Sequence, residues 1–162
     1  MDAIQLLESQ HREVEDLFEE IQGSDDNDEK TELFEELADK LAVHASIEEH
    51  HFYPAVRARR TEDILLESLE EHLSLKRLLA DLLELAPGAT TFEPKFKVLK
   101  EQTEHHHKEE EEHLFPTVRK LIAAPVLAAL GEQMLALQRS LQREGAPREA
   151  VSEQTDEAAP LQ

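Results

Sequence analysis

The sequence predicts an all-α protein, an antiparallel up-and-down four-helix bundle followed by an extra helix. Leu, Ala, Glu and Lys are abundant and the chain has only four glycines, a composition typical of helical proteins. Apolar residues recur at helical spacing over four long segments. The loops between these segments are short, and short loops join antiparallel neighbours in a bundle. At 162 residues the chain is long enough for one domain with a substantial core.

The first pair of helices is expected before residue 60. Apolar residues from Ile4 to Ile21 follow the helical period and outline a helix over about residues 2–22, which ends at Gly23 before an acidic loop. The second helix is expected over about residues 29–59. Proline lacks the backbone N–H that a helix interior needs, so Pro54 should kink or shorten this helix near its end.

The second pair completes the predicted bundle over residues 1–121. The third helix begins at Thr61 and is closed by the Pro87-Gly88 pair, and the fourth runs from about Thr91 to about Leu121. An additional helix is expected within residues 122–144, where it would cover the bundle or form a dimer surface. Residues 145–162 are rich in Pro, Ala, Ser and Glu with almost no apolar pattern, which predicts a disordered acidic tail.

Charge and composition restrict the function. The formal net charge of −20 disfavours binding to nucleic acid or to an anionic membrane, because attraction to phosphate dominates such binding. No apolar stretch is long enough to cross a bilayer, and the N-terminus has no signal-like region, so we expect a cytoplasmic monomer or homodimer. Cysteine is absent, so a bound metal would need nitrogen and oxygen ligands, which suits iron, manganese or zinc.

A duplicated motif is the main indication of function. The segments that start at His44 and His106 share a histidine, two glutamates, a second histidine, a proline, a valine and an arginine at the same relative positions. Upstream, His11 and His72 are each followed by apolar residues at the same relative positions. The chain therefore resembles one helix pair used twice, with imidazole and carboxylate groups at fixed places in each copy.

The spacing of the motif predicts a site for two metal ions. Residues four apart lie on one face of a helix, so His44 and Glu48 should both point into the bundle, as should their counterparts on the fourth helix. Burying these groups without partners is unfavourable, and bound cations would remove that penalty. In a symmetric arrangement two histidines hold each ion, both glutamates and a solvent oxygen bridge the ions, and one position stays open for a small molecule. The predicted ligands are His11, His44, Glu48, His72, His106 and Glu110.

These six residues and their flanking sequences resemble the hemerythrin-like, or HHE cation-binding, family over about residues 1–121. The resemblance implies a non-haem di-iron centre with an oxo or hydroxo bridge, in which manganese or zinc is also possible. It further implies binding of or reaction with dioxygen, peroxide or nitric oxide. The expected roles are oxygen or redox sensing, iron handling, or peroxide detoxification by a catalase-like or peroxide-reducing activity.

One position departs from the pattern of that family. The oxygen-carrying hemerythrins place a fifth histidine one turn after the histidine of the third helix, and this chain has Lys76 there. The iron served by the third helix would then lack one nitrogen ligand. A more open pair of irons favours peroxide chemistry, redox sensing, nitric oxide binding or iron holding over reversible oxygen carriage.

Two other arrangements compete with this interpretation. The spacings Glu48-x-x-His51 and Glu110-x-x-His113 are typical of ferritin-like di-iron carboxylate bundles. That arrangement would need an inward glutamate on the first and third helices and would leave four histidines without a role. The other alternative is an interaction module that has kept a structural metal without redox activity. His50, His105 and His107 lie about 100° away from the ligand face and are expected on the surface.

Overall fold

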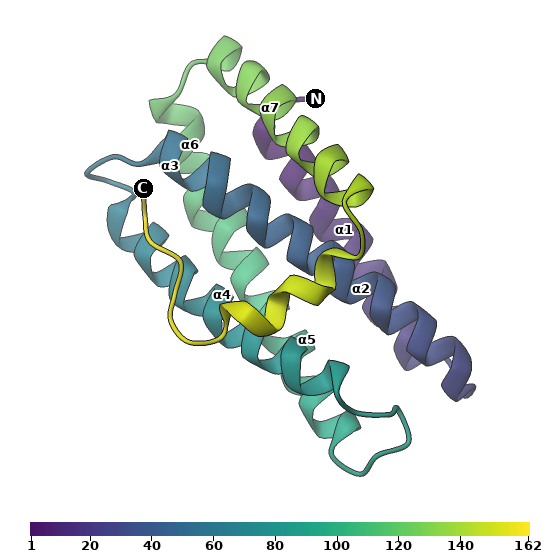
Figure 1. The fold of residues 1–162 in the computed structure, drawn as a ribbon. Coiled ribbons are helices and arrows are strands. Elements are labelled where there is room, and N and C mark those ends of the chain that lie inside the picture. The colour runs from purple at the N-terminus through teal and green to yellow at the C-terminus, as the bar shows by residue number, and fades with distance from the viewer.

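The computed structural model describes all 162 residues and is entirely helical. Four long helices form the predicted up-and-down bundle (Figure 1). They are α1 (Ala3–Gln22), α2 (Asn27–Ile47), α4 (Glu62–Leu83) and α5 (Phe92–Glu109). The helices of each sequential pair pack against each other, while α1 also contacts α5 and α2 also contacts α4. No helix combines the length and the apolar character that a membrane crossing requires.

A π-helical turn interrupts each of the two helices that carry the duplicated motif. After α2 it spans Glu48–Phe52 and leads into α3 (Tyr53–Val56), and after α5 it spans Glu110–Leu114 and leads into α6 (Phe115–Leu121). The Tyr53 N–H donates to the Glu48 carbonyl five residues back, and Phe115 donates to Glu110 in the same way. A proline follows each of these donors. Its ring would clash with the carbonyl four residues back, so a widened turn accommodates it.

The apolar core consists of two clusters that a polar layer separates. One cluster of 17 buried residues contains Leu7, Leu69 and Phe115 and lies toward α3, α6 and α7. The other, of 15 buried residues, contains Phe18, Leu37 and Phe96 and lies toward the opposite end of the bundle. Apolar burial on both sides stabilises the bundle, so the layer between the clusters is free to carry polar side chains.

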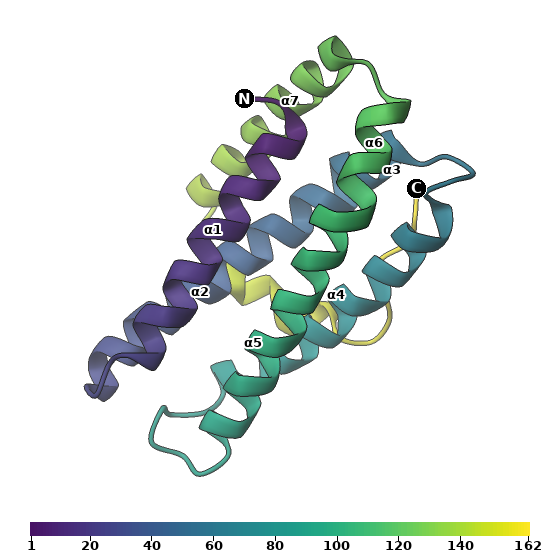
Figure 2. The same ribbon diagram turned by 180° about the vertical axis from the view of Figure 1, so that it is seen from behind.

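The additional helix is α7 (Ala124–Arg143), which packs along α1 and α2 (Figure 2). Gly131 lies where α7 meets the start of α1. A Cβ at this position would come within 2.8 Å of backbone atoms of Met1 and Asp2. The close approach therefore requires glycine. This helix covers the bundle, which is one of the two roles expected from the sequence.

The structure corrects the prediction of a disordered tail. Residues Pro147–Gln154 form the 3₁₀ helix η3, which packs on α2 and α4, and the following residues run along the bundle to end near α3 (Figure 1). Val151 is only 2% exposed and belongs to the second apolar cluster. One apolar side chain and several polar anchors hold this segment, a pattern too sparse to be recognised as periodic in the sequence.

Candidate metal centre

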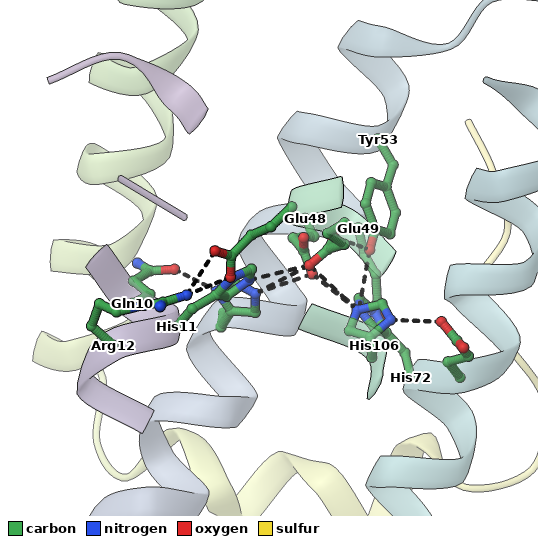
Figure 3. A network of polar contacts seen from close by, with 12 residues as sticks. Gln10, His11, Arg12, Glu48, Glu49, Tyr53, His72 and His106 are labelled. Carbon is green, nitrogen blue, oxygen red and sulfur yellow. Dashed lines mark hydrogen bonds and ion pairs between the residues drawn. The ribbon is translucent and has the colours of Figure 1, made fainter. Parts of the chain in front are cut away.

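The polar layer brings together side chains from all four bundle helices. The six residues predicted as ligands are all there: His11 from α1, His44 from α2, His72 from α4, His106 from α5, and Glu48 and Glu110 at the starts of the two π-helical turns (Figure 3). Each is at most 3% exposed. The apolar stripes that build the core therefore also carry these polar groups, as the i, i+4 spacing predicts.

The first cluster of nitrogen donors lies between α1, α2 and α5. It consists of His11, His44 and His107, whose candidate ligand atoms lie within 4.8 Å of one another. The His107 ring stacks on that of His11 with a centroid separation of 3.7 Å. The expectation of a surface position for His107 was wrong, because this residue is only 3% exposed. His50 and His105 are exposed, as predicted.

The second cluster lies between α4 and α5. His72 Nε2 and His106 Nε2 are 3.2 Å apart, and Glu48 Oε1 lies 3.0 Å from the former and 3.7 Å from the latter. Two imidazole nitrogens this close repel each other unless a proton or a cation lies between them. This side of the layer provides two imidazoles, whereas the first cluster provides three.

The two buried carboxylates connect the clusters. Glu48 Oε1 approaches His44 Nε2 at 3.3 Å as well as the second cluster. Glu110 Oε1 approaches His11 Nε2 at 3.2 Å and His106 Nε2 at 3.6 Å. Both glutamates therefore contact imidazoles of both clusters, the arrangement expected of carboxylates shared by two metal positions.

The unpartnered atoms of the layer fit bound cations. Four buried atoms without a hydrogen-bond partner lie here: His11 Nε2, His44 Nε2, Glu48 Oε2 and Glu110 Oε1. Such groups are unfavourable in a protein interior unless they are hydrogen-bonded or coordinate a metal. All four are metal-ligating atom types, and they face the same interior space as the two clusters. The residues present therefore fit a pair of metal ions.

In each of the four predicted ligand histidines, Nε2 faces the layer and Nδ1 makes a hydrogen bond that orients the ring. His11 Nδ1 donates to Glu111 Oε2 at 2.8 Å, and His72 Nδ1 donates to Glu49 Oε2 at 2.8 Å. These acceptors fix the tautomer, so the Nε2 lone pairs point into the layer. Lys76, the residue that departs from the oxygen-carrier pattern, is buried and pairs with Glu49 at 2.9 Å instead of reaching the layer.

His44 and His106, the other two predicted ligand histidines, are also oriented by a hydrogen bond at Nδ1. His44 Nδ1 donates to Gln10 Oε1 and His106 Nδ1 donates to Glu71 Oε1, both at 2.7 Å. Gln10 in turn donates to Gln138 of α7 at 2.6 Å, so the additional helix is connected to the layer through one hydrogen bond. Glu71 is thus an outer partner of His106 and not the inward ligand that a ferritin-like site would need.

One tyrosine completes the layer. The Tyr53 hydroxyl donates to Glu110 Oε2 at 2.8 Å and lies 3.3 Å from His72 Nε2, and the side chain is fully buried. Burial and the nearby carboxylates of Glu110 and Glu48 raise the pKa of Tyr53 well above its usual range. The phenol therefore keeps its proton and donates it in a hydrogen bond to the shared carboxylate.

The metal-free layer binds protons in place of cations. Burial would lower the pKa of His11, but the nearby carboxylates of Glu110 and Glu111 outweigh it and raise this pKa to about 9. Burial and the charge of Glu48 raise the pKa of Glu110 to about 7. Burial, with the neighbouring rings of His11 and His44, holds the pKa of His107 well below its usual range. His107 is therefore neutral and able to ligate.

The alternative Glu-x-x-His pairs are not assembled. His51 is half-buried and His113 is exposed, and neither belongs to a cluster of candidate ligands. His105 and Glu109 form another His-x-x-x-Glu pair, one residue before that of His106 and Glu110. His105 is 63% exposed, however, and contacts only Glu71. The sequence spacing is ambiguous between these registers, whereas the packing of α5 against α4 and α1 selects His106 and His107.

A family model supports the metal-binding character of this layer. The model of the hemerythrin HHE cation-binding domain matches residues 2–118, and a second match covers residues 64–154. The chain belongs to this family. The second match begins near the start of α4, as expected when the second helix pair resembles the first.

Two known proteins show how far this likeness extends. A solved hemerythrin HHE cation-binding domain-containing protein from Mycobacterium kansasii superposes with a TM-score of 0.81 at 25% identity, covering 95% of this chain and 99% of that one. A protein from Nostoc sp. named a DNA nickase is 29% identical over 119 residues, which are 74% of this chain. The matched region is only 34% of that relative, so the chain spans about a third of its length.

Proposed function

We propose that this HHE-domain protein is a non-haem di-iron protein that binds or reacts with a small oxygen species: dioxygen, peroxide or nitric oxide. One observation carries the proposal. Two clusters of buried imidazoles, three on one side and two on the other, are joined by two carboxylates, and the unpartnered atoms of this layer are ligand atoms. Five imidazoles and two carboxylates without a thiolate suit iron and also accept manganese or zinc.

The residues divide between the two metal positions. His11, His44 and His107 would hold one ion, His72 and His106 the other, and Glu48 with Glu110 would serve both. Iron bound here would supply electron exchange with a small oxygen species. The unequal number of imidazoles leaves the position served by α4 the more open of the two, so we place the exchange of small molecules there.

The protein contributes orientation, protons and exclusion of water. The Nδ1 partners hold each ring so that its free lone pair faces inward. Tyr53 keeps a proton on the side of Glu110 that faces His72, the more open side of the layer. Burial of every ligand keeps bulk water out, which favours controlled reaction over uncontrolled leakage of reactive species.

The test is metal content combined with absorption spectroscopy. The protein purified in air should carry about two irons per chain and show the near-ultraviolet and visible bands of a bridged ferric pair. Glu110→Ala removes a carboxylate shared by both positions and should abolish these bands. Glu112→Ala, two residues away and exposed, is the matched control and should leave them unchanged.

The same preparation distinguishes an enzyme from a sensor or carrier. Sustained turnover of hydrogen peroxide by the iron-loaded protein would establish a catalase-like or peroxide-reducing activity. A stable spectral change on addition of peroxide or nitric oxide, without turnover, would indicate sensing or carriage. A single zinc or no metal, with an unchanged helical circular dichroism spectrum, would contradict the di-iron proposal and leave a structural metal-binding module.

A further inference from the structure

The C-terminal segment lies across the side of the bundle where α2 and α4 face each other with few direct contacts. Helices α2 and α4 contact η3 more extensively than they contact each other. In Figure 1 the yellow segment crosses in front of both helices at the middle of the bundle. Two of its residues, Val151 and Gln154, share a cavity with histidines of the polar layer. We call residues 147–156 the strap.

Polar contacts hold the strap at both ends. At its start, the Arg148 guanidinium pairs with Asp39 at 3.0 Å and Glu35 at 2.8 Å, both on α2. At its far end, the Arg77 guanidinium of α4 donates to the carbonyls of Thr155 at 2.9 Å and Asp156 at 3.1 Å. The strap is thus fixed to both helices whose gap it covers.

A small cavity lies between the strap and the metal layer. Its volume is about 20 Å³, and it is lined by four imidazoles on one side, by apolar side chains and Lys76 around it, and by the strap on the other. A cavity that holds one water molecule needs a volume of ~10–15 Å³ on the same scale. The imidazoles are those of His44, His72, His106 and His107. The cavity therefore has room for a molecule of one or two heavy atoms in direct reach of both clusters.

The lining of the cavity indicates the chemistry of its occupant. Leu41, Leu75 and Val151 supply an apolar surface, and the ammonium group of Lys76 is already paired with Glu49. The apolar part of the lining disfavours an ionic ligand, because a charge loses its hydration against it. The surroundings fit a small uncharged molecule such as dioxygen, nitric oxide or hydrogen peroxide.

Val151 and Gln154 are the strap residues that line the cavity, and Val151 is the buried one. Its side chain is 2% exposed and packs in the second apolar cluster, while the residues on either side of it are exposed. Gly145, which joins α7 to the strap, has a φ of 136°, a conformation that L side chains rarely adopt. The chain can thus reverse direction after α7 and lay one apolar residue over the opening.

We propose that the strap, through Val151, selects by size which molecules reach the metal layer, admitting uncharged species of two heavy atoms and excluding alkyl hydroperoxides. This inference rests on the proposed function for the identity of the small molecule. The strap and the cavity themselves are features of the protein chain. Both can therefore be tested without iron, so that failure to bind iron and failure of the strap are separate results.

The first experiment asks whether the cavity takes up a diatomic molecule. Dissolved dioxygen is paramagnetic and increases the NMR relaxation of nearby methyl groups. In the metal-free protein we expect a larger increase at the methyls of Leu41, Leu75 and Val151 than at those of Leu6 and Leu130, which are buried to a similar degree in the first apolar cluster. Equal increases at both sets would overturn the assignment of the cavity.

The second experiment asks whether Val151 controls access. Diethyl pyrocarbonate, a bulky reagent, modifies accessible neutral imidazoles, and peptide mass spectrometry locates the products. Val151→Ala removes two buried methyl groups that hold the strap closed. It should raise roughly tenfold the modification rate of His44 and His107, two cavity-lining imidazoles whose pKa values are lowered by burial. Exposed His105 and His113 should react at the same rate in every variant and serve as internal standards.

Val118→Ala is the matched control, because it makes the same change in the other apolar cluster, where Val118 is fully buried. It should leave modification of His44 and His107 near the wild-type rate. Equal acceleration by both substitutions would mean that the reagent enters by general loosening of the bundle. No acceleration by Val151→Ala would mean that the strap does not close the route. Either result would overturn the proposal.

Discussion

The two halves of the metal layer have the same scaffold but different chemistry. The acceptors for the histidine Nδ1 atoms occupy matched places in the two helix pairs: Gln10 corresponds to Glu71, and Glu49 corresponds to Glu111. Gln10 and Glu71 directly precede the histidines of α1 and α4. Glu49 and Glu111 directly follow the two glutamates that contact both clusters. The duplication therefore includes the residues that orient the ligands as well as the ligands themselves.

Differences between the halves lie at a few non-repeated positions. His107 on α5 corresponds to Ala45 on α2, so only the first cluster has a third imidazole. Tyr53 corresponds to Phe115, so a phenol reaches the shared carboxylate on one side and a plain ring packs on the other. The duplicated helix pair places the candidate ligands, and single differences between the halves would make one proposed metal position more saturated and the other more open.

The strongest way to break this asymmetry is to remove the third imidazole. His107→Ala should weaken the metal at the first cluster by at least ~100-fold, because even outer partners of metal ligands contribute 10- to 100-fold. Elemental analysis and titration calorimetry should then show one metal retained and one lost under limiting metal. His107→Phe, which keeps a ring stacked on His11, should have the same effect if the nitrogen is what matters.

His105→Ala is the control for this prediction, because His105 lies on the same helix and is exposed. It should bind both metals with the affinity of the unmodified protein. Retention of both metals at full affinity by His107→Ala would contradict a ligand role for His107. It would also restore the symmetric two-histidine assignment for each ion that the sequence predicted.

Proton binding by His11 offers a second test, on the metal-free protein. Its pKa is raised from 6.5 to about 9, so the stabilisation is fully present below pH 6.5 and is lost as the pH rises through about 9. The shift corresponds to ~3 kcal/mol. The pKa values of His72 and His106 are raised as well, because carboxylates outweigh burial, and these residues act in the same direction.

Thermal unfolding of the metal-free protein should therefore show a lower Tm at pH 9 than at pH 6.5. Glu111→Gln removes the negative charge beside His11 Nδ1 and should make this decrease shallower. Bound metal replaces the proton, so the metal-loaded protein should lose the decrease altogether. A Tm of the metal-free protein that rises over this range would contradict the proton-binding role of the layer.

The smallest effect is expected at Tyr53. Tyr53→Phe removes only the hydroxyl that donates to Glu110, and the free energy of unfolding should fall by about 1 kcal/mol. The absorption of the iron-loaded protein should shift because the shared carboxylate loses its donor. The reciprocal change Phe115→Tyr is the matched control in the other half. An unchanged spectrum and stability in Tyr53→Phe would show that the hydroxyl does not act on the centre.

Much of the fold was predictable because periodicity and breakers are local signals. The four bundle helices and α7 lie close to the expected segments, and the six predicted ligands, found from i, i+4 spacing combined with the repeat, lie in one buried layer. The strap could not be found in this way. Its partners Asp39 and Arg77 lie far away in sequence, and only one of its apolar residues is fully buried.

His107 was missed for a related reason. The sequence prediction gives each helix one narrow face of inward-pointing side chains. His107 lies about 100° from His106 around the helix and so falls outside that face. Helix α5, however, contacts both α1 and α4, so its buried face is wide enough for two adjacent histidines. His106 meets His72 and His107 meets His11. The signal in the sequence was the spacing His107-x-x-x-Glu111, a second His-x-x-x-Glu one residue after the first.

The paired π-helical turns separate two tasks along each motif helix. Residues before each turn belong to the bundle register that aims the histidines, whereas residues after it, such as Val56 and Val118, pack in the apolar cluster at that end. Each turn begins at the shared glutamate itself. The residues that bind can thus keep one register while those that seal the core are re-aimed, and selection can change either set without displacing the other.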